Sequence, residues 1–365
     1  MKMIDLIAGA RPNFMKIAPI IEAINKAHEK GSDLSYRLIH TGQHYDQNMS
    51  GSFFEQLRLP EPDINLGIGS GTQAVQAAGI MVGYEKVLIQ EKSNLCVVVG
   101  DVTSTMACAI TAQKMHVPVA HVEGGLRSGD WSMPEEVNRI VTDAVSNWYF
   151  TTSQFANDNL LKGGVKKDRI FLVGNTMIDT LISNLGRLKT PEIWRKANLQ
   201  EKKYLLLTLH RPNNVDSSET LKHFLETIIK YRHDLPVVFP VHPRTKKILQ
   251  TLKEDLDLPD LYKIEPLSYL EFNYLVKNAM AVITDSGGIT EETTVLGVPC
   301  MTLRDSTERP ETISLGTNEL VGTKPEALQP YLARLFAGKW KNGRIPPFWD
   351  GKAAERIVRQ IEALL

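Results

Sequence analysis

Polar and ionisable residues follow nearly every short apolar run in this sequence of 365 residues. The N-terminal half places Arg11, Lys16, Gln43, His44, Asp101, Glu123 and Glu135 there, and the C-terminal half places His210, His242, Ser286 and Glu292 there. Purely structural turns would more often carry Gly, Asn or Ser. Carboxylates, lysines and histidines are groups that hold anions and transfer protons. The pattern therefore favours a functional site built from strand ends.

The stretch "TDSGGITEET", Thr284 to Thr293, is typical of a strand end, a two-glycine turn and the start of a helix. Ser286 to Gly288 would present backbone N–H groups to a phosphate, to which the helix dipole adds about 0.3–1 kcal/mol. Glu292 would then meet the sugar hydroxyls of a nucleotide, and Arg11 would clamp its diphosphate. The alternative is an ordinary helix capped by Asp285 or Ser286.

Other motifs indicate neither a metal nor a nicotinamide cofactor. "GIGSGT", Gly67 to Thr72, lacks the Lys-Ser/Thr ending of a P-loop and reads as a flexible loop. His210 and His242 have no carboxylate or thiol at ligand spacing, so we expect no metal site. The three cysteines lie far apart, and Cys96 and Cys300 sit in apolar runs that fit structural roles.

The charge balance excludes a global attraction to nucleic acid or to an anionic membrane. Lys and Arg number 42, as do Asp and Glu, so an anion must be held locally. No apolar run reaches the roughly 18 residues of a membrane span. The first segment, "MKMIDLIAG", carries Asp5 inside its apolar stretch and is predicted to be a strand of a cytoplasmic protein.

Apolar runs alternating with amphipathic segments predict parallel sheets covered by helices on both faces. Runs such as "LCVVVGD" and "PVAHVEG" precede a polar stretch, and the pattern restarts at "YLLLTLH". We therefore expect two doubly wound, Rossmann-like α/β domains, residues 1–175 and 176–350. The last segment, 351–365, is predicted to be a helix that packs back onto the first domain.

Seven motifs in order resemble the non-hydrolysing UDP-N-acetylglucosamine 2-epimerases over nearly the whole chain. They are "GARPNFMKIAP", "HTGQHYD", "GDVTST", "HVEGGLRSGDWSMPEEVNR", "LTLHRPNN", "EPLSYLEF" and "TDSGGITEETTVLGVPCMTLRDSTERPET". The resemblance implies a glycosyltransferase-B-like fold, with UDP held by the second domain and the sugar in the cleft between domains. It also implies a homodimer that makes surface polysaccharide precursors.

The family's reaction inverts C2 of UDP-GlcNAc to give UDP-ManNAc, by anti elimination of UDP to 2-acetamidoglucal and re-addition. By resemblance, Asp101, Glu123 and Glu135 occupy acid/base positions, while Lys16, Arg11 and His210 lie near the diphosphate. The UDP-contacting positions correspond to Phe272 beside the uracil and to Ser286, Gly287, Gly288, Glu292 and Arg309. This chemistry is redox neutral and implies no cofactor.

Departures from the family pattern leave alternatives open. Members that are activated by a second substrate molecule use a Gln-His run and a downstream Arg. Gln43 and His44 are present, but Tyr45 and Asp46 follow them and "GIGSGT" stands near the place of the Arg. Relatives that epimerise UDP-2,3-diacetamido-2,3-dideoxy-glucuronate share similar features. A glycosyltransferase of the same fold would need fewer carboxylates in its first domain, and a nucleotide-sugar sensor would need none.

Overall fold

The computed structural model describes residues 2–42, 55–69, 71–252 and 258–365. The chain divides into two compact units. The N-terminal domain comprises Met1–Ser183 and Pro347–Leu365, and the C-terminal domain comprises Asn184–Pro346. None of the helices in the described ranges combines the length and apolar composition that a membrane crossing needs.

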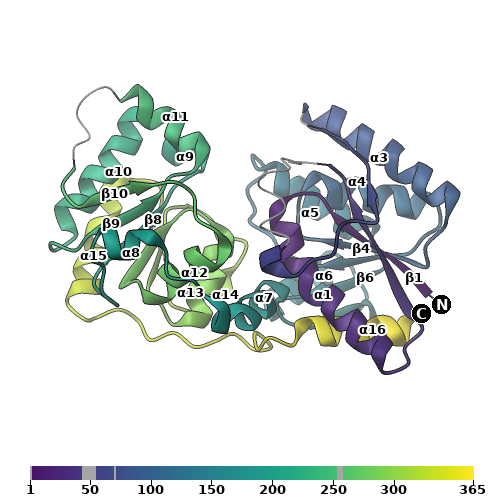
Figure 1. Ribbon diagram of the computed structural model, residues 1–365. Coiled ribbons are helices and arrows are strands. Elements are labelled where there is room, and N and C mark those ends of the chain that lie inside the picture. Colours follow the sequence, from purple (N-terminus) through teal and green to yellow (C-terminus); the bar gives the residue numbers. More distant parts are fainter. Residues whose placement is uncertain (1, 43–54, 70, 253–257) are drawn as a thin grey trace. The chain divides into compact units, whose positions relative to one another are not determined.

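The N-terminal domain contains one parallel sheet of seven strands in the order β3-β2-β1-β4-β5-β6-β7 (Figure 1). Its strands are β1 (Lys2–Ala8), β2 (Leu34–His40), β3 (Ile64–Asn65), β4 (Leu95–Val99), β5 (Val119–Val122), β6 (Trp148–Thr151) and β7 (Ile170–Leu172). Its helices are α1 (Arg11–Glu29), α3 (Gln73–Gln90), α4 (Thr103–Lys114), α5 (Pro134–Val145), α6 (Gln154–Lys162), α7 (Thr176–Asn184) and α16 (Ala353–Leu364). Apolar side chains of α3 and α4 pack on the sheet, including Tyr84, Val87 and Ala109.

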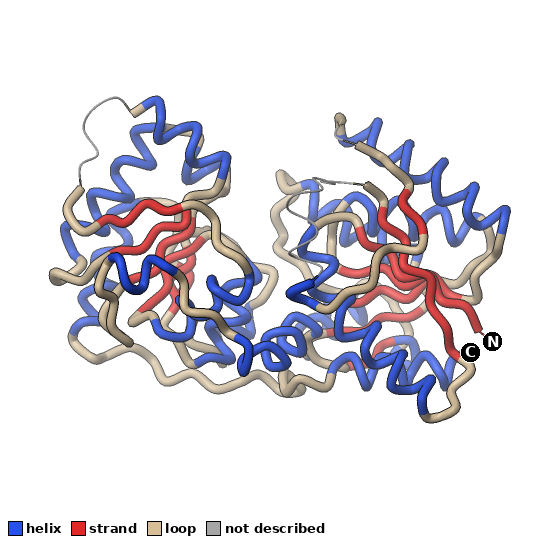
Figure 2. Tube along the Cα trace, in the orientation of Figure 1, coloured by secondary structure: helices blue, strands red, loops and turns tan. Residues whose placement is uncertain are grey.

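The C-terminal domain contains a second parallel sheet, whose strands are drawn in red in Figure 2. Its six strands lie in the order β10-β9-β8-β11-β12-β13. Its strands are β8 (Leu205–Thr208), β9 (Val237–Pro240), β10 (Leu261–Ile264), β11 (Ala281–Thr284), β12 (Cys300–Thr302) and β13 (Asn318–Leu320). Its helices are α8 (Glu192–Lys196), α9 (Pro212–Val215), α10 (Ser218–Tyr231), α11 (Pro243–Thr251), α12 (Tyr269–Asn278), α13 (Gly287–Leu296), α14 (Pro310–Ser314) and α15 (Leu328–Phe336). One core cluster joins the sheet to α10 and α15, and a second joins it to α8 and α12.

The C-terminal helix α16 packs against α1 of the N-terminal domain, as the sequence predicted. The carboxylate of Asp179 accepts hydrogen bonds from the backbone N–H groups of Ala353 and Ala354 at 3.1 and 2.7 Å, at the start of α16. Trp349 is buried and donates from its indole to the Thr152 carbonyl at 3.0 Å. The end of the chain is therefore fixed to the first domain by a helix cap and an aromatic anchor.

Each sheet has one point where the strand order reverses. In the N-terminal sheet, β1 lies between β2 and β4, and in the C-terminal sheet, β8 lies between β9 and β11. The connections from the two strands at such a point run to opposite faces of the sheet. The loops at the carboxyl ends of these strands therefore diverge and leave a crevice between them. The loops after β1, β4, β8 and β11 are therefore the places to look for a site.

Candidate active site

A buried ion pair lies at the reversal point of the N-terminal sheet. Lys16 Nζ, from α1, is 2.6 Å from Glu123 Oε2, which follows β5, and the two side chains are only 9% and 2% exposed. Gly100, after β4, has a φ of +66°, and a Cβ atom there would lie 2.8 Å from Lys16 Nζ. The lysine reaches Glu123 because this turn has no side chain.

Glu123 has a left-handed backbone, with a φ of +69°. For a residue with a side chain this conformation costs about 1–3 kcal/mol and is concentrated at functional sites. The backbone N–H of Glu123 donates to the Phe150 carbonyl of β6 at 2.9 Å, which holds the strained residue in place. The fold thus accepts strain to direct this carboxylate toward Lys16.

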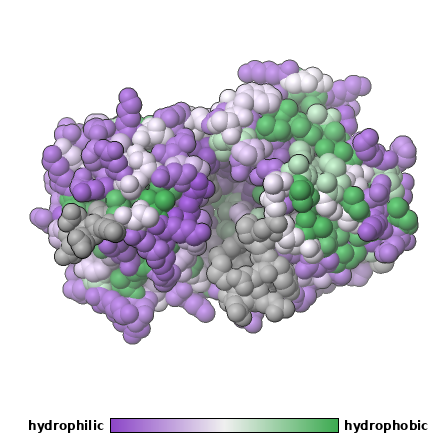
Figure 3. Space-filling view, turned by 90° about the horizontal axis from the view of Figure 1, so that it is seen from above, coloured by the Kyte–Doolittle hydropathy of each residue, from purple (hydrophilic) through white to green (hydrophobic). Residues whose placement is uncertain are grey.

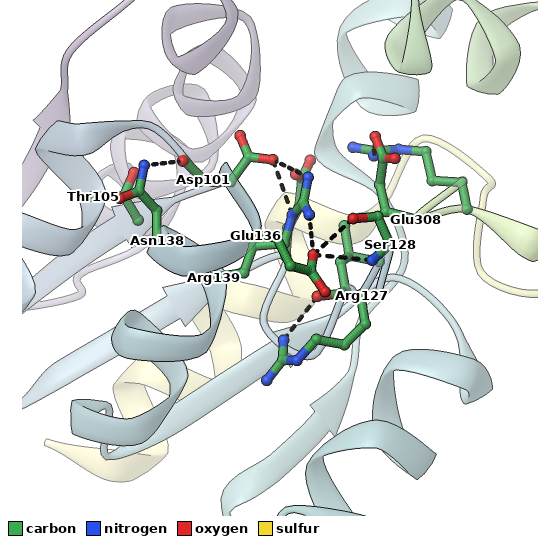
Figure 4. A network of polar contacts seen from close by, with 12 residues as sticks. Asp101, Thr105, Arg127, Ser128, Glu136, Asn138, Arg139 and Glu308 are labelled. Carbon is green, nitrogen blue, oxygen red and sulfur yellow. Dashed lines mark hydrogen bonds and ion pairs between the residues drawn. The ribbon is translucent and has the colours of Figure 1, made fainter. Parts of the chain in front are cut away.

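Asp101 is held by Arg139 of α5 (Figure 4). The guanidinium donates from Nε and Nη2 to Asp101 Oδ2 at 3.0 and 2.7 Å, while Asn138 donates to the Asp101 carbonyl at 2.9 Å. The side chain of Asp101 remains 26% exposed, whereas that of Arg139 is 3% exposed. A charge-assisted pair of this kind orients a carboxylate while leaving it accessible to a ligand.

Glu136 completes the network in Figure 4 and binds the same arginine. Its carboxylate also accepts the backbone N–H groups of Ser128 and Gly129, at 3.0 and 2.9 Å. Burial would raise the pKa of Glu136, but these N–H groups and Arg139 lower it below its usual value. Glu136 is therefore a fixed anion. The neighbouring Glu135 is half-buried and points about 100° away around α5.

At the reversal point of the C-terminal sheet, Asp285 orients His210. The His210 Nδ1 atom is 2.7 Å from Asp285 Oδ1, and Asp285 is fully buried. Asp285 also accepts the backbone N–H groups of His210 and Arg211, each at 2.9 Å. Burial would raise the pKa of Asp285, but bonding to His210 and the backbone lowers it. The His210 side chain is 39% exposed, and the buried carboxylate of Asp285 fixes its orientation.

The helix α13 begins as the sequence predicted, at the two-glycine turn, with Ser286 at the N-cap position. The side chain of Ser286 forms no capping bond, and Asp285 is committed to the His210 turn. Simple capping by either residue, the alternative raised from the sequence, is therefore not what the structure shows. A helix start that its N-cap side chain does not cap is a favourable place for an anion to bind.

A buried chain of opposite charges packs against this turn. Glu308 lies between two arginines, accepting from Arg304 Nη2 and Arg309 Nη1, each at 2.8 Å, and Arg309 also pairs with Glu291. A Cβ atom on Gly287 would lie 2.7 Å from Glu308 Oε1. Gly287 is therefore required for close packing of this network on the helix start.

Glu292 is buried and bonded to neutral partners. Tyr269 Oη donates to Glu292 Oε1 at 2.9 Å, and Asn273 donates to it at 3.3 Å. Burial, with a smaller contribution from Glu291, raises the pKa of Glu292 to about 7 against these bonds. Phe272, on the same helix as Tyr269, is partly buried against the core. Unlike Glu136, Glu292 is poised to change charge near neutral pH.

Three predicted site residues lie wholly or partly outside the residues that the structure describes. Arg11 is the first residue of α1, directly after the β1 turn, and its side chain lies outside the described part. Gln43 and His44 lie outside the described residues altogether. Within the described ranges, no group of three or more His, Cys, Asp or Glu side chains could hold a metal ion.

The comparisons with known proteins agree with one another. A family model described as UDP-N-acetylglucosamine 2-epimerase matches residues 26–362. The chain is 44% identical over 370 residues to the UDP-N-acetylglucosamine 2-epimerase of Methanocaldococcus jannaschii, with 98% of each chain covered. A crystal structure of the Methanocaldococcus jannaschii UDP-GlcNAc 2-epimerase in complex with UDP-GlcNAc and UDP matches with a TM-score of 0.87, over 100% of both chains. The UDP-2,3-diacetamido-2,3-dideoxy-D-glucuronate 2-epimerase of Pseudomonas aeruginosa is 37% identical over 367 residues, covering 100% of both chains.

Two doubly wound parallel domains, with carboxylates and histidines at their strand ends, define a two-domain α/β enzyme of the glycosyltransferase-B-like class. The predicted fold class is thereby confirmed. The chain belongs to the UDP-N-acetylglucosamine 2-epimerase family, a family of isomerases. The resemblance inferred from the seven motifs is also confirmed.

Sequence reasoning missed the side chains that hold the predicted ones. Glu136 and Arg139 were visible as charges after a strand, but choosing between Glu135 and Glu136 requires the orientation of α5. Glu308 was missed although its partners Arg304 and Arg309 are four and one residues away, and Asp285 was considered only as a helix cap, because its partner His210 is 75 residues away. His121 and Asp143 were missed as well; they pair beneath the loops of Asp101 and Glu123.

We predict that Glu292 makes stability fall as pH rises. The pKa of Glu292 is about 7 in the folded protein, against the usual 4.5. Between these pH values the folded protein keeps the proton, whereas the unfolded chain has lost it. By linkage, this weakens folding progressively across that range, by at most about 3 kcal/mol. Glu292→Gln keeps the neutral shape, so its urea midpoint should exceed that of the wild type increasingly from pH 5 to pH 8.

The exposed Glu326→Gln, in the same domain, serves as the control. Asp179, whose pKa is raised to about 6 by burial, adds a similar slope to both proteins and cancels in the comparison. Parallel pH profiles for wild type and Glu292→Gln would show that Glu292 is ionised throughout.

Proposed function

We propose that this protein reversibly epimerises UDP-GlcNAc to UDP-ManNAc at C2. In the elimination step the C2–H and C1–O bonds break and UDP leaves, giving 2-acetamidoglucal. A proton then returns to the opposite face of C2 as UDP adds again to C1. The observation that carries the proposal is the pair of carboxylates, Asp101 and Glu123, each oriented by a buried cation at one sheet edge in a member of this family.

The N-terminal domain is proposed to move the protons. C2 is a weak acid, so its deprotonation needs a positioned base, and each acid or base group contributes about 10²–10⁴-fold to the rate. Asp101, Glu123 and Glu135 are assigned to acid and base roles. Lys16 supplies the positive charge beside Glu123.

The C-terminal domain is proposed to hold UDP. The start of α13 at Ser286 to Gly288 is assigned to the diphosphate, together with the partly exposed His210. The N–H group of Ser286 already donates to Thr284 Oγ1 at 3.0 Å, so the N–H groups of Gly287 and Gly288 are the proposed donors. Glu292 is assigned to the ribose hydroxyls and Phe272 to the uracil, while Arg309 holds the start of α13 through Glu291 and Glu308. Arg11, in the loop after β1, is assigned to the diphosphate.

The UDP-sugar with acetamido groups at both C2 and C3 remains the second candidate substrate. The 37% identity to the Pseudomonas aeruginosa enzyme supports it, whereas the 44% identity to the Methanocaldococcus jannaschii enzyme favours UDP-GlcNAc. The carboxylates Asp101 and Glu123, both oriented in one domain, weigh against a glycosyltransferase, which needs fewer.

The experiment that tests the reaction is proton NMR of UDP-GlcNAc with the protein in D2O. We expect deuterium at C2 of both epimers, because proton loss and return on opposite faces exchange the C2 hydrogen with solvent. Epimerisation with full retention of the C2 proton would contradict elimination. A parallel reaction with the diacetamido glucuronate substrate decides between the two sugars.

We predict that Asp101→Asn, Glu123→Gln and Glu135→Gln each lower turnover at least about 100-fold, because each removes a proton-transferring group. UDP affinity, measured by calorimetry, should change far less, since the UDP contacts are assigned to the other domain. The exposed Glu29→Gln is the matched control. Near-normal turnover in all three variants would assign these carboxylates a structural role.

Two features support a cytoplasmic homodimer, namely the buried cysteines and an apolar stripe on the exposed side of α3. Cys96, Cys108 and Cys300 are buried and unbridged, as in a reducing compartment.

The helix α3 exposes Val75, Val82 and Ile89, which are 65%, 52% and 68% exposed and recur every seven residues. Figure 3 shows apolar side chains gathered on this domain. A stripe with heptad spacing fits the same stripe of a second copy across a two-fold axis.

We predict that Val82→Glu converts a dimer to a monomer, because it places paired like charges at the centre of the stripe. Light scattering after gel filtration measures the mass. Leu161→Glu, which changes an equally apolar exposed residue on α6, is the control. A Val82→Glu protein that keeps the mass of the wild-type dimer would exclude this face as the interface.

A further inference from the structure

A fully buried histidine lies beneath the two turns that carry Asp101 and Glu123. His121 belongs to β5 and has no solvent exposure. Its Nδ1 atom is 2.7 Å from Asp143 Oδ1, and its Nε2 atom is 2.8 Å from the Gly100 carbonyl oxygen. Both ring nitrogens therefore contact oxygen atoms at hydrogen-bond distance.

The hydrogen-bond count determines the charge of this ring. A carbonyl oxygen only accepts, so Nε2 must carry a proton toward Gly100. Asp143 is held as an anion by Arg127 and by the Gly125 N–H group, both of which contact its Oδ2 atom. An ionised Asp143 also only accepts, so Nδ1 must carry a proton as well. With a proton on both nitrogens, the ring is an imidazolium.

Asp143 connects this ring to the Glu123 turn. Its Oδ2 atom accepts the backbone N–H of Gly125 at 3.0 Å and pairs with Arg127 at 2.6 Å. Gly125 has a φ of +84°, and a Cβ atom there would lie 2.3 Å from the Ala156 carbonyl. The turn after Glu123 is thus fixed by close packing of Gly125 on α6 and by its hydrogen bond to the Asp143 carboxylate.

The same ring connects to the Asp101 turn through Gly100. The Gly100 carbonyl accepts from His121, and its N–H donates to the Val122 carbonyl at 3.0 Å. Asp101 follows directly, and a Cβ atom on Gly100 would meet Lys16 and Glu123. Asp101 and Glu123, two of the three candidate acid/base carboxylates, therefore lie within one or two residues of groups that His121 and Asp143 hold.

We infer that the His121 imidazolium and Asp143 form a positioning pair, buried below the site, that sets the direction of both Asp101 and Glu123. The pair does not touch the substrate, and its role in catalysis rests on the proposed epimerisation. The charged and titratable groups around it are Arg127 on Asp143, Tyr149, which donates to the Asp143 carbonyl, and the Lys16–Glu123 pair near Gly100. A proton on each ring nitrogen explains why an imidazole is buried here between an anion and a carbonyl.

The charge is tested directly on the wild-type protein by ¹⁵N NMR of labelled histidine, with His121→Gln used to assign the signal. We expect both ring nitrogens of His121 to be protonated at pH 7, because each lies at hydrogen-bond distance from an oxygen atom that only accepts. A neutral tautomer of His121 at pH 7 would overturn the inference. This measurement does not depend on any activity.

The positioning role is tested with Asp143→Asn, which keeps the size of the side chain and removes its charge. Misdirected carboxylates should lower kcat roughly 10- to 100-fold. The KM for UDP-GlcNAc and the affinity for UDP should stay within about threefold, because Asp143 contacts neither by assignment. The pH profile of kcat should also shift, since the charge near Asp101 and Glu123 has changed.

The matched control is Asp5→Asn. Asp5 is also a buried carboxylate of this domain, bonded to Arg37 at 2.8 Å and to Tyr84 at 2.8 Å, and it lies within β1, whereas Asp143 lies in α5. We expect both variants to lower the melting temperature but only Asp143→Asn to lower kcat. Equal kcat values for the two variants would overturn the positioning role. A wild-type protein without epimerase activity would overturn the proposed function, and the NMR spectrum would still decide the charge of His121.

Discussion

The Lys16–Glu123 ion pair is the contact on which the N-terminal half of the site depends. A carboxylate or an ammonium ion buried alone costs several kcal/mol, so neither side chain can occupy its position without the other. The pair in turn requires a glycine at Gly100 and a left-handed Glu123. Those backbone conformations persist because β5 and β6 are paired beneath them. One electrostatic requirement thus determines the loop residues around the site.

The C-terminal domain solves the same problem with different groups. Asp285 is held by His210 and backbone N–H groups, and Glu308 is held by two arginines, so both carboxylates are buried with compensation. Glu292 is the exception, because its hydroxyl and amide partners carry no charge. Its raised pKa follows directly from that difference. Ribose hydroxyls are neutral donors too, so a ligand would add to this environment without altering its character.

The strands could be predicted because each buried strand is a local run of apolar residues. "LCVVVGD" and "AVITDSGG" each contain a fully buried strand that ends where the charges begin. The short edge strands β3 and β13 lack such a run and escaped notice. Asp101 and Glu123 were found because they end strands, and this position is local. His121 and Asp143 are determined by their contact with each other, across 22 residues of the chain, which no local pattern encodes.

Buried ionisable groups in this protein therefore fall into two kinds, separated by their partners. Glu136, Asp143 and Asp285 each accept backbone N–H groups and contact an arginine or a histidine side chain, and their pKa values are lowered. Such groups keep a constant charge at any physiological pH and can only orient their neighbours. The permanently charged residues are accordingly placed beneath the loops, and Asp101, 26% exposed, is left at the surface where a substrate can reach it.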